Sequence, residues 1–323
     1  MKVVMIGEAA KHKDELTAQS EHRLEVVALP SEAAFSSEYD GIISEDDVVV
    51  TLKFSRPQPH NLKFRLLHVP GAGLDGIDMS AVPPDAIVCN VYEHQIPIAE
   101  YVMLAMLEWE IRLSAMRKNF SFEKWSGEYL SRVPHGELFG KHLVLVGFGG
   151  IGREIARRAR AFGMHIAAVD KYAADKEGLA DILLKNEEID TVLGKADFLV
   201  VTCPLTDETK SMINRDVFDA MKKDAVLVNV SRGPIVAEKD LYEALSAGKI
   251  AGAVLDVWWR YPKTSDDKVA PADYPFESMP NVICTPHSCA WTKELTWRRY
   301  GVIAHNIDNL IEGKPLKNVV ACK

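Results

Sequence analysis

One segment of the chain constrains the fold more than any other: an apolar run that leads into a glycine-rich turn and then a helical pattern. Residues 143–146 are Leu, Val, Leu and Val, and residues 147–152 read GFGGIG. In such a turn Gly147 permits the tight bend, Gly149 lets a pyrophosphate approach the backbone, and Gly152 lets the helix pack closely on the strand. The segment therefore predicts a strand, turn and helix that bind a dinucleotide.

The residues around this turn also indicate which dinucleotide is bound. Free backbone N–H groups at the start of the helix, at Gly150 and Ile151, are suited to hold phosphate oxygens. Asp170 ends the next apolar run, where a carboxylate can accept hydrogen bonds from the adenosine ribose and would repel a 2′-phosphate. Lys171 follows and could partly accommodate that phosphate, yet the pattern as a whole favours NAD over NADP.

Short apolar runs recur along the chain in two series. The first series comprises residues 3–6, 24–29, 48–51, 66–69 and 87–91. The second comprises residues 143–146, 166–169, 198–201, 225–230, 253–255 and 282–285. These runs are apolar on both faces, as in parallel strands covered by helices on both sides, and the second series leaves room for crossover helices. We therefore predict an α/β fold with doubly wound parallel sheets.

Two further segments follow helical spacing. Apolar residues between 99 and 116 indicate one long amphipathic helix, and those between 295 and 310 indicate another, which Gly313 and Pro315 end. A chain of 323 residues exceeds what one hydrophobic core usually supports. We therefore expect two domains with a cleft between them.

Composition argues against several classes of function. The formal net charge is −8 and no run of lysine and arginine forms a basic stripe, so a nucleic-acid partner is not expected. No stretch approaches the length of an apolar membrane span and no signal-peptide pattern opens the chain, so we expect a cytoplasmic protein without a membrane segment. The five cysteines form no CxxC pair and no histidine and carboxylate cluster has ligand spacing, so no metal is expected.

Beyond the glycine motif, several segments make the sequence resemble the D-isomer-specific 2-hydroxyacid dehydrogenase family. The segments that carry the resemblance are residues 136–152, 203–206, 229–233, 255–257 and 285–287, with weaker similarity at 71–78 and 98–100. The resemblance implies an oxidoreductase that uses NAD to interconvert a small 2-oxo acid and its D-2-hydroxy acid.

The resemblance also implies the domain arrangement. Residues 1–96 and 292–323 would form a flavodoxin-like substrate domain, and residues 97–291 would form a Rossmann domain for the cofactor. The small carboxylate substrate would react in the cleft between them. The protein would form a homodimer through its cofactor domain.

Three residues in the matching segments carry the chemistry that the resemblance implies. Arg232 would hold the substrate carboxylate with its guanidinium group and polarise the reacting carbonyl. His287 would exchange a proton with the carbonyl oxygen, a role suited to a side chain with an ordinary pKa of about 6.5. Asp256 corresponds to a family residue near the nicotinamide carboxamide, although an acid at a strand end can equally serve as a turn cap.

The resemblance places further cofactor contacts on two loops that follow predicted strands. They are Cys203, Pro204 and Thr209 on one loop and Val230 and Ser231 on the other. The first loop would shape the cofactor groove mainly through backbone atoms.

Substrate contacts are expected in the N-terminal half. Counted back from Glu100, His94 occupies the position at which formate dehydrogenases of the family carry a substrate-binding asparagine; a histidine on a surface loop is the alternative. Lys53 lies in a turn where family members offer backbone N–H groups to the carboxylate, and its side chain could add charge or face solvent. Ala72 and Gly73, in the weaker N-terminal signature, complete the predicted set.

One position departs from the family pattern. Tyr261 stands where many members carry a glutamate that pairs with the catalytic histidine. A phenol can orient the imidazole but supplies no charge, so His287 should titrate lower than in a carboxylate-paired member. Two alternatives therefore stay open: direct hydride abstraction from formate or a similarly small anion, which needs no proton transfer, and a non-catalytic NAD-sensing protein. The presence of both Arg232 and His287 argues against the sensor.

Overall fold

The computed structural model describes residues 1–262 and 266–321 and divides into two compact units. The central unit comprises Gln95–Ala290 and contains the glycine-rich turn. The split unit comprises Met1–His94 together with Trp291–Lys323. Each unit has its own sheet and its own hydrophobic cores.

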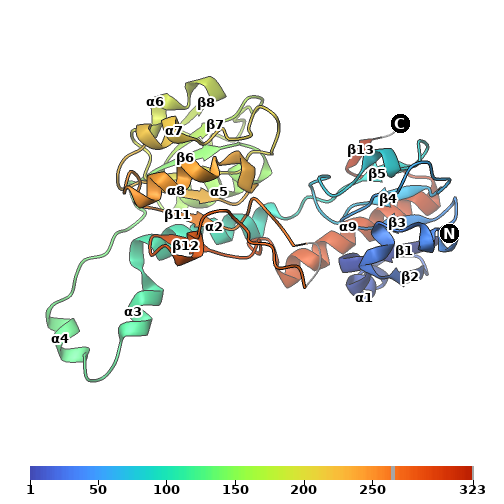
Figure 1. Cartoon of the computed structure of the whole chain (residues 1–323), viewed down its shortest axis with the longest axis horizontal. Coiled ribbons are helices and arrows are strands. Elements are labelled where there is room, and N and C mark those ends of the chain that lie inside the picture. Colours follow the sequence, from blue (N-terminus) through green and yellow to red (C-terminus); the bar gives the residue numbers. More distant parts are fainter. Residues whose placement is uncertain (263–265, 322–323) are drawn as a thin grey trace. The chain divides into compact units, whose positions relative to one another are not determined.

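The central unit contains a seven-stranded parallel sheet (Figure 1). Its strands are β6 (His142–Val146), β7 (His165–Val169), β8 (Ile182–Leu184), β9 (Phe198–Val201), β10 (Val226–Asn229), β11 (Gly252–Leu255) and β12 (Val282–Cys284). They lie in the order β12-β11-β10-β9-β6-β7-β8, so the direction of winding reverses between β6 and β9. This is the Rossmann order, with the switch point beside the strand that ends in the glycine turn.

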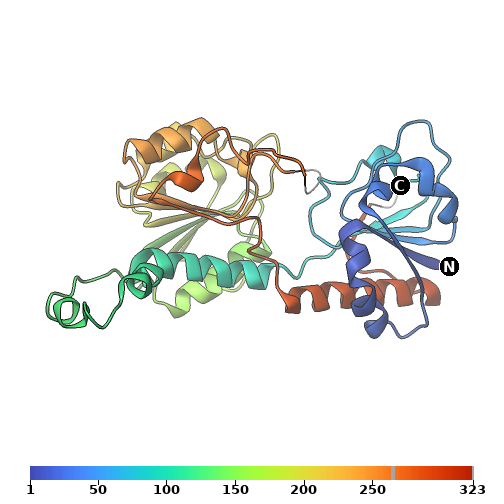
Figure 2. The same cartoon turned by 60° about the horizontal axis from the view of Figure 1, so that its bottom comes forward.

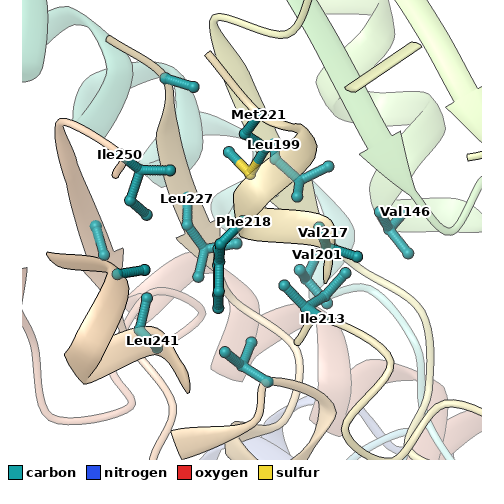
Figure 3. Close-up of a cluster of buried hydrophobic side chains, with 14 of the residues drawn as sticks. Val146, Leu199, Val201, Ile213, Val217, Phe218, Met221, Leu227, Leu241 and Ile250 are labelled. Atoms are coloured by element: carbon teal, nitrogen blue, oxygen red, sulfur yellow. The ribbon is translucent and has the colours of Figure 1, made fainter. Parts of the chain in front are cut away.

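Helices cover both faces of this sheet because successive strand residues point to opposite sides and nearly all are apolar. The helices of the unit are α2 (Gln95–Ile111), α3 (Leu113–Asn119), α4 (Trp125–Leu130), α5 (Gly150–Ala161), α6 (Asp190–Leu193), α7 (Arg215–Ala220) and α8 (Glu238–Ser246). Leu143 and Leu145 of β6 pack with α2 and α5. Val144 and Val146 face the other core, with α6, α7 and α8, part of which Figure 3 shows. Figure 2 shows α2 (teal) and α8 (orange) on opposite sides of the sheet.

The helix predicted over residues 99–116 is interrupted in the structure. α2 ends just before Arg112, which takes a left-handed conformation with φ 57°, and α3 follows. The carboxylate oxygens of Glu108 accept from the N–H of Ser114 at 3.2 and 3.3 Å, which stabilises the break. The single-helix prediction was wrong because neither glycine nor proline marks the break and the apolar spacing continues across it.

Beyond this break the chain projects away from the central sheet as an arm, defined as residues 113–136, which carries α3 and α4 (Figures 1 and 2). A groove of 860 Å³ lies between the arm and the end of α2. The arm leaves large apolar side chains exposed: Leu113, Phe120, Phe122, Leu130 and Val133. The arm therefore presents more apolar surface than its own short helices cover.

The split unit contains a six-stranded sheet in the order β13-β5-β4-β3-β1-β2. Its strands are β1 (Lys2–Ile6), β2 (Glu25–Leu29), β3 (Val48–Val50), β4 (Leu66–His68), β5 (Ile87–Cys89) and β13 (Val319–Ala321). The first five are parallel in a flavodoxin-like order, and β13 pairs with β5 in the antiparallel sense. The predicted fold class, two doubly wound parallel sheets, is confirmed. β8 and β13, each three residues long, were not predicted.

Helix α9 (Lys293–Glu312) lies with α1 (Lys13–Gln19) against one face of this sheet, and it packs on Val3 and Met5 of β1. The side chain of Thr292 accepts from the N–H of Leu295 at 3.1 Å and starts the helix. Gly313, at φ 68°, ends it, as the sequence predicted. The other face carries its own apolar core rather than a long helix.

Short 3-10 helices complete the connections in both units. They are η1 (Gly7–His12), η2 (Ser31–Ala34), η3 (Ser37–Ile42), η4 (Met79–Ala81), η5 (Asn186–Glu188), η6 (Gly233–Ile235) and η7 (Phe276–Ser278). In the described part of the chain, no helix combines the length and apolar character that a membrane span requires.

Candidate active site

The glycine-rich turn lies at the carboxyl end of β6, and close packing requires two of its glycines. Gly147 has φ 103°, and a Cβ there would lie 2.5 Å from the backbone nitrogen of Cys203. A Cβ on Gly152 would lie 2.4 Å from the carbonyl oxygen of Gly147. At Gly149, by contrast, a Cβ would meet nothing within 4 Å. The turn is therefore tight where strand and helix meet and open where a pyrophosphate would approach.

The N-terminus of α5 faces this open side of the turn. The helix begins at Gly150 with Gly149 as its N-cap, and no side chain caps it. The N–H groups of its first turn, including those of Gly150 and Ile151, have no acceptor within the helix, and the helix dipole favours an anion there. The turn and the helix start thus fit the pyrophosphate of a dinucleotide.

Asp170 follows β7 and borders a cavity of 360 Å³ beside the turn. Its carboxylate accepts three backbone N–H groups, from Phe148 at 2.7 Å and from Tyr172 and Ala173 at 2.8 Å. Burial alone would raise the pKa of Asp170, but these N–H groups lower it below its ordinary value. A carboxylate has about four acceptor positions, so the charged group keeps capacity for a ribose hydroxyl.

The loop after β9 forms another wall of the same cavity, and Cys203, Pro204 and Thr209 all line it. The hydroxyl of Thr209 donates to the carbonyl oxygen of Pro204 at 2.7 Å and accepts from the N–H of Thr206 at 2.7 Å. Burial raises the pKa of the Cys203 thiol to about 12, so the thiol stays neutral. Thr209 therefore fixes the shape of this wall.

The loop after β10 carries Arg232, and its backbone is held from several sides. The Oδ1 of Asn229 accepts from the N–H of Ser231 at 3.1 Å, and its Nδ2 donates to the carbonyl oxygen of Arg232 at 3.0 Å. The hydroxyl of Ser231 donates to the carbonyl oxygen of Cys203. The side chain of Val230 is buried in the core. These contacts fix the backbone from which the guanidinium group extends.

His287 lies on the loop after β12, next to Tyr261. The centroids of the two rings are 5.4 Å apart and the ring planes are tilted by 49°. The hydroxyl of Tyr261 accepts from the N–H of Trp258 at 3.0 Å, which holds the phenol in place. His287 has φ 57°, a backbone conformation that side chains other than glycine seldom adopt. The backbone of His287 is therefore strained, and its imidazole lies beside the neutral ring of Tyr261.

Asp256 anchors this loop from beneath. It is fully buried, and its carboxylate accepts from the hydroxyl of Thr285 at 2.5 Å and from the N–H groups of Ser288 and Cys289 at 2.9 and 3.1 Å. The hydroxyl of Thr285 also lies 2.7 Å from that of Tyr101, on α2. Because Thr285 gives its proton to Asp256, Tyr101 is the donor. The predicted contact of Asp256 with the nicotinamide stays a prediction, whereas its structural role on the loop is visible.

The surroundings of His287 shift its titration. Desolvation by the protein lowers its pKa below the ordinary value of 6.5 and is the largest effect. Asp256 raises the pKa in part, because its charge stabilises the imidazolium, and Arg232 lowers it by repulsion. Position 261 carries a tyrosine and no carboxylate, and the net effect of the surroundings is to lower the pKa of His287.

Three of the four predicted substrate residues of the split unit lie on two adjoining loops, after β3 and β4. The carbonyl oxygen of Lys53 accepts from a threonine hydroxyl within its own turn, and the side chain of Lys53 is exposed. The N–H of Phe54 donates to the carbonyl oxygen of Gly76 at 2.9 Å, so this turn is bonded to the loop that carries Ala72 and Gly73. The split unit therefore brings three of its four predicted residues onto neighbouring loops.

His94, the fourth, lies at the end of the split unit's first segment. Its Nδ1 is 3.0 Å from the carbonyl oxygen of Tyr92, and its ring stacks on that of Tyr92. Asn90, which the sequence did not single out, is buried after β5 and donates to the carbonyl oxygen of Ala72 at 2.9 Å. Its Oδ1 has no partner among the described residues. Asn90 is thus a further polar group at this end of the sheet.

One contact that supports the site was not predicted from the sequence. It joins Tyr101 to Thr285, a residue of the matching segment 285–287, across 184 positions. No group of three or more His, Cys, Asp or Glu within residues 1–262 and 266–321 is arranged to hold a metal ion.

The chain also matches known families and proteins. The model of the family described as "D-isomer specific 2-hydroxyacid dehydrogenase, NAD binding domain" matches residues 103–289. This match confirms the NAD-binding domain that the glycine motif predicted.

Two curated relatives are each 33% identical to the chain. One is D-3-phosphoglycerate dehydrogenase of Methanocaldococcus jannaschii, over 80% of this chain and 48% of that protein. The other is hydroxypyruvate reductase of Thermotoga maritima, over 90% of this chain and 89% of that protein. The chain thus spans about half the length of the first relative and most of the second.

Among solved structures, a D-isomer specific 2-hydroxyacid dehydrogenase family protein from Aeromonas salmonicida superposes with a TM-score of 0.78 at 25% identity. The match covers 100% of this chain and 99% of that one. The similarity therefore extends over both units of the fold.

Proposed function

Because the chain belongs to the D-isomer specific 2-hydroxyacid dehydrogenase family, we propose that it is an NAD-dependent oxidoreductase that interconverts a small 2-oxo acid and its D-2-hydroxy acid. The observation that carries the proposal is the placement of Arg232 and His287. Both lie on loops at the carboxyl end of the sheet that bears the glycine turn. Bound NADH would supply the hydride in reduction and bound NAD would accept it in oxidation, and the protein supplies binding and proton transfer.

Arg232 binds the substrate carboxylate in this proposal. A guanidinium group presents paired N–H donors that match a carboxylate, and it keeps its charge at any physiological pH. The anchored backbone of Arg232 limits the positions its side chain can sample, which favours one orientation of the substrate. The same group polarises the reacting carbonyl.

His287 is the acid in reduction and the base in oxidation. In reduction its imidazolium gives a proton to the carbonyl oxygen, and in oxidation its neutral ring takes the hydroxyl proton. Asp256 stabilises the charged form and holds the loop, whereas Tyr261 packs beside the ring and orients it. The tyrosine supplies no negative charge, because its pKa is raised by partial burial.

The split unit supplies the remaining substrate contacts. We assign these to Lys53, Ala72, Gly73 and His94, and the NAD site to the central unit. Asp170 holds the adenosine ribose, and Asp256 is assigned to the nicotinamide carboxamide. A cytoplasmic location stays a prediction.

A second candidate function is direct hydride abstraction from formate or another small anion. The neutral Tyr261 beside His287 favours it, because such a reaction needs no proton transfer at this position. The charge of Asp256, which stabilises the protonated form of His287, favours the 2-oxo acid reaction.

Substrate turnover distinguishes these functions. NADH oxidation would be measured with glyoxylate, hydroxypyruvate, pyruvate and phenylpyruvate, and NAD reduction with formate and D-2-hydroxy acids. We expect turnover of at least one small 2-oxo acid. Turnover of formate alone would replace the proposal with the second function, and NADH binding without turnover of any compound would indicate a sensor.

We also propose that two copies of the chain associate through the central unit, with the arm as the contact. Phe122, Leu130 and Val133 are 88, 82 and 84% exposed, and helices as short as α3 and α4 are marginal without packing. Cyclic dimers of identical chains are the commonest soluble assemblies. A second central unit would cover these side chains.

A further inference from the structure

The cofactor cavity contains an ion pair that the function described so far does not use. Lys171 and Glu208 both line the cavity beside Asp170, and the Nζ of Lys171 lies 2.8 Å from each carboxylate oxygen of Glu208. We propose that this pair sets the cofactor preference. The ammonium group of Lys171 donates to Glu208 and is therefore not available to bind the 2′-phosphate of NADP. The inference deepens the proposed function, since it rests on Asp170 holding the adenosine ribose.

Lys171 follows Asp170, the carboxylate proposed to bind the ribose. Its charge therefore affects whether the cavity can bind a 2′-phosphate. A 2′-phosphate carries roughly two negative charges and needs cationic donors close to the ribose. Asp170 repels it, and Lys171 alone could offset that repulsion. With both carboxylate oxygens of Glu208 on the ammonium group, Lys171 instead contributes a neutral pair, and the net charge at this wall stays negative.

Other cations near Asp170 are held by their own partners. The Nζ of Lys185 donates to the carbonyl oxygen of Lys171 at 2.9 Å. The guanidinium group of Arg153 donates to the carbonyl oxygen of Ala174 at 2.6 Å and stacks on the ring of Phe148 at 4.7 Å. The charge of Lys185 contributes to the lowered pKa of Asp170, but its ammonium group, like the guanidinium group of Arg153, already donates to a backbone carbonyl oxygen. The partner of Lys171, by contrast, is a side chain, so a single substitution at Glu208 can remove it.

The side chains of Lys171 and Glu208 are 40 and 64% exposed, and Glu208 stands on a turn that backbone hydrogen bonds hold. The N–H of Thr209 donates to the carbonyl oxygen of Thr206 at 3.2 Å, and that of Lys210 donates to the same oxygen at 2.9 Å. The hydroxyl of Thr209 ties the start of this turn to Pro204. These hydrogen bonds restrict the backbone of Glu208 and keep its side chain close to Lys171.

The test replaces the carboxylate by its neutral isostere. In Glu208→Gln the ammonium group of Lys171 loses its charged partner, and we expect the Kd of NADPH to fall about tenfold, equivalent to about 1.4 kcal/mol. The Kd of NADH should change less than about twofold. Both are measured by titrating the nucleotide fluorescence of the enzyme complex, which requires no knowledge of the substrate.

Two control variants separate this mechanism from a general loss of negative charge. Asp207→Asn removes a neighbouring carboxylate of the same cavity and should improve NADPH binding much less than Glu208→Gln. The double variant Lys171→Met with Glu208→Gln should lose the gain. An equal gain in Asp207→Asn, a gain that survives in the double variant, or no gain in Glu208→Gln would overturn the proposal.

One further variant distinguishes failure of this inference from failure of the cofactor assignment. Asp170→Ala should narrow the ratio of the NADPH and NADH dissociation constants, because it removes the carboxylate proposed to bind the ribose. If that ratio stays unchanged in Asp170→Ala, the ribose is held elsewhere and the assignment itself fails. If the ratio shifts in Asp170→Ala but not in Glu208→Gln, only the role of the ion pair is wrong.

Discussion

At the scale of single residues, the proposed reaction site depends on side chains whose backbones are fixed by hydrogen bonds from strand ends and neighbouring loops. Arg232 is anchored through Asn229, and the His287 loop is anchored through Asp256 and Thr285. A cation and a titratable ring therefore both follow strands at the carboxyl end of the sheet. Two consequences can be measured directly.

Replacing Arg232 should abolish most of the recognition of the substrate carboxylate. Arg232→Ala leaves that carboxylate without its charged partner, and we expect a loss of about 3 kcal/mol, or roughly 150-fold in kcat/KM, in steady-state assays. Arg232→Lys keeps the charge but not the paired donors and should recover only part of the loss. Arg160→Ala, at an exposed arginine on α5, is the control and should behave as wild type. Wild-type kcat/KM in Arg232→Ala would remove Arg232 from the site.

The pH dependence of reduction should report His287. The protonated ring is the acid, so kcat/KM for 2-oxo acid reduction should fall as the pH rises through its pKa, which lies below 6.5 in the free enzyme. In Asp256→Asn the charge that stabilises the imidazolium is lost, so this fall should move to lower pH. The comparison needs kcat/KM profiles of both proteins and a thermal unfolding curve to verify folding. A profile that moves to higher pH, or does not move, would contradict the role given to Asp256.

At the scale of secondary structure, the junction of β6 with α5 combines two demands, close packing and an open anion site. The demands fall on different glycines, because a Cβ at Gly152 would overlap backbone whereas one at Gly149 would meet nothing. Stability and cofactor binding should therefore be separable by two very similar substitutions.

Gly152→Ala should destabilise the fold by about 1 to 3 kcal/mol, since its methyl group has no space beside the Gly147 carbonyl. Gly149→Ala should cost less than about 1 kcal/mol, the usual effect of changing an N-cap glycine. The latter variant should nevertheless bind NADH at least tenfold more weakly, because its methyl group occupies the approach of the pyrophosphate. Denaturant unfolding and NADH titration check both. Wild-type affinity in Gly149→Ala would place the pyrophosphate elsewhere.

Most strands and the glycine-rich turn could be predicted from the sequence, because buried parallel strands and such a turn have strong local sequence patterns. The break at Arg112 could not, since a left-handed arginine has no local signature. The Tyr101 to Thr285 contact and the Lys171 to Glu208 pair also escaped prediction. Each joins residues that only the folded sheet brings together, 184 and 37 positions apart.

At the scale of the whole molecule, the residues proposed to bind cofactor and most of those proposed to bind substrate belong to different units, and the arm exposes apolar side chains. The arm extends from the central unit (Figure 1). Its large apolar side chains are exposed. If this surface is the contact between two copies, charges introduced there should prevent association without disturbing either sheet.

The variant Leu130→Asp with Val133→Asp should convert a dimer into a monomer, because two carboxylates cannot be buried in an apolar contact without a large cost. Size-exclusion chromatography with light scattering gives the mass of each form. Phe35→Asp, at an exposed apolar residue of the split unit, is the matched control and should stay dimeric. A monomeric wild type, or a double variant that stays dimeric, would reject the arm as the contact.

The proposed reduction of a 2-oxo acid by hydride transfer, with His287 as the proton donor, is tested most directly by NADH oxidation in His287→Gln. We predict that kcat falls by roughly 10²- to 10⁴-fold relative to wild type with the same 2-oxo acid, the usual contribution of a general acid. The Kd of NADH should stay within about twofold, because His287 is not among the residues proposed to bind the nucleotide. Unchanged turnover in His287→Gln would contradict the account, since hydride transfer would then proceed without this proton donor.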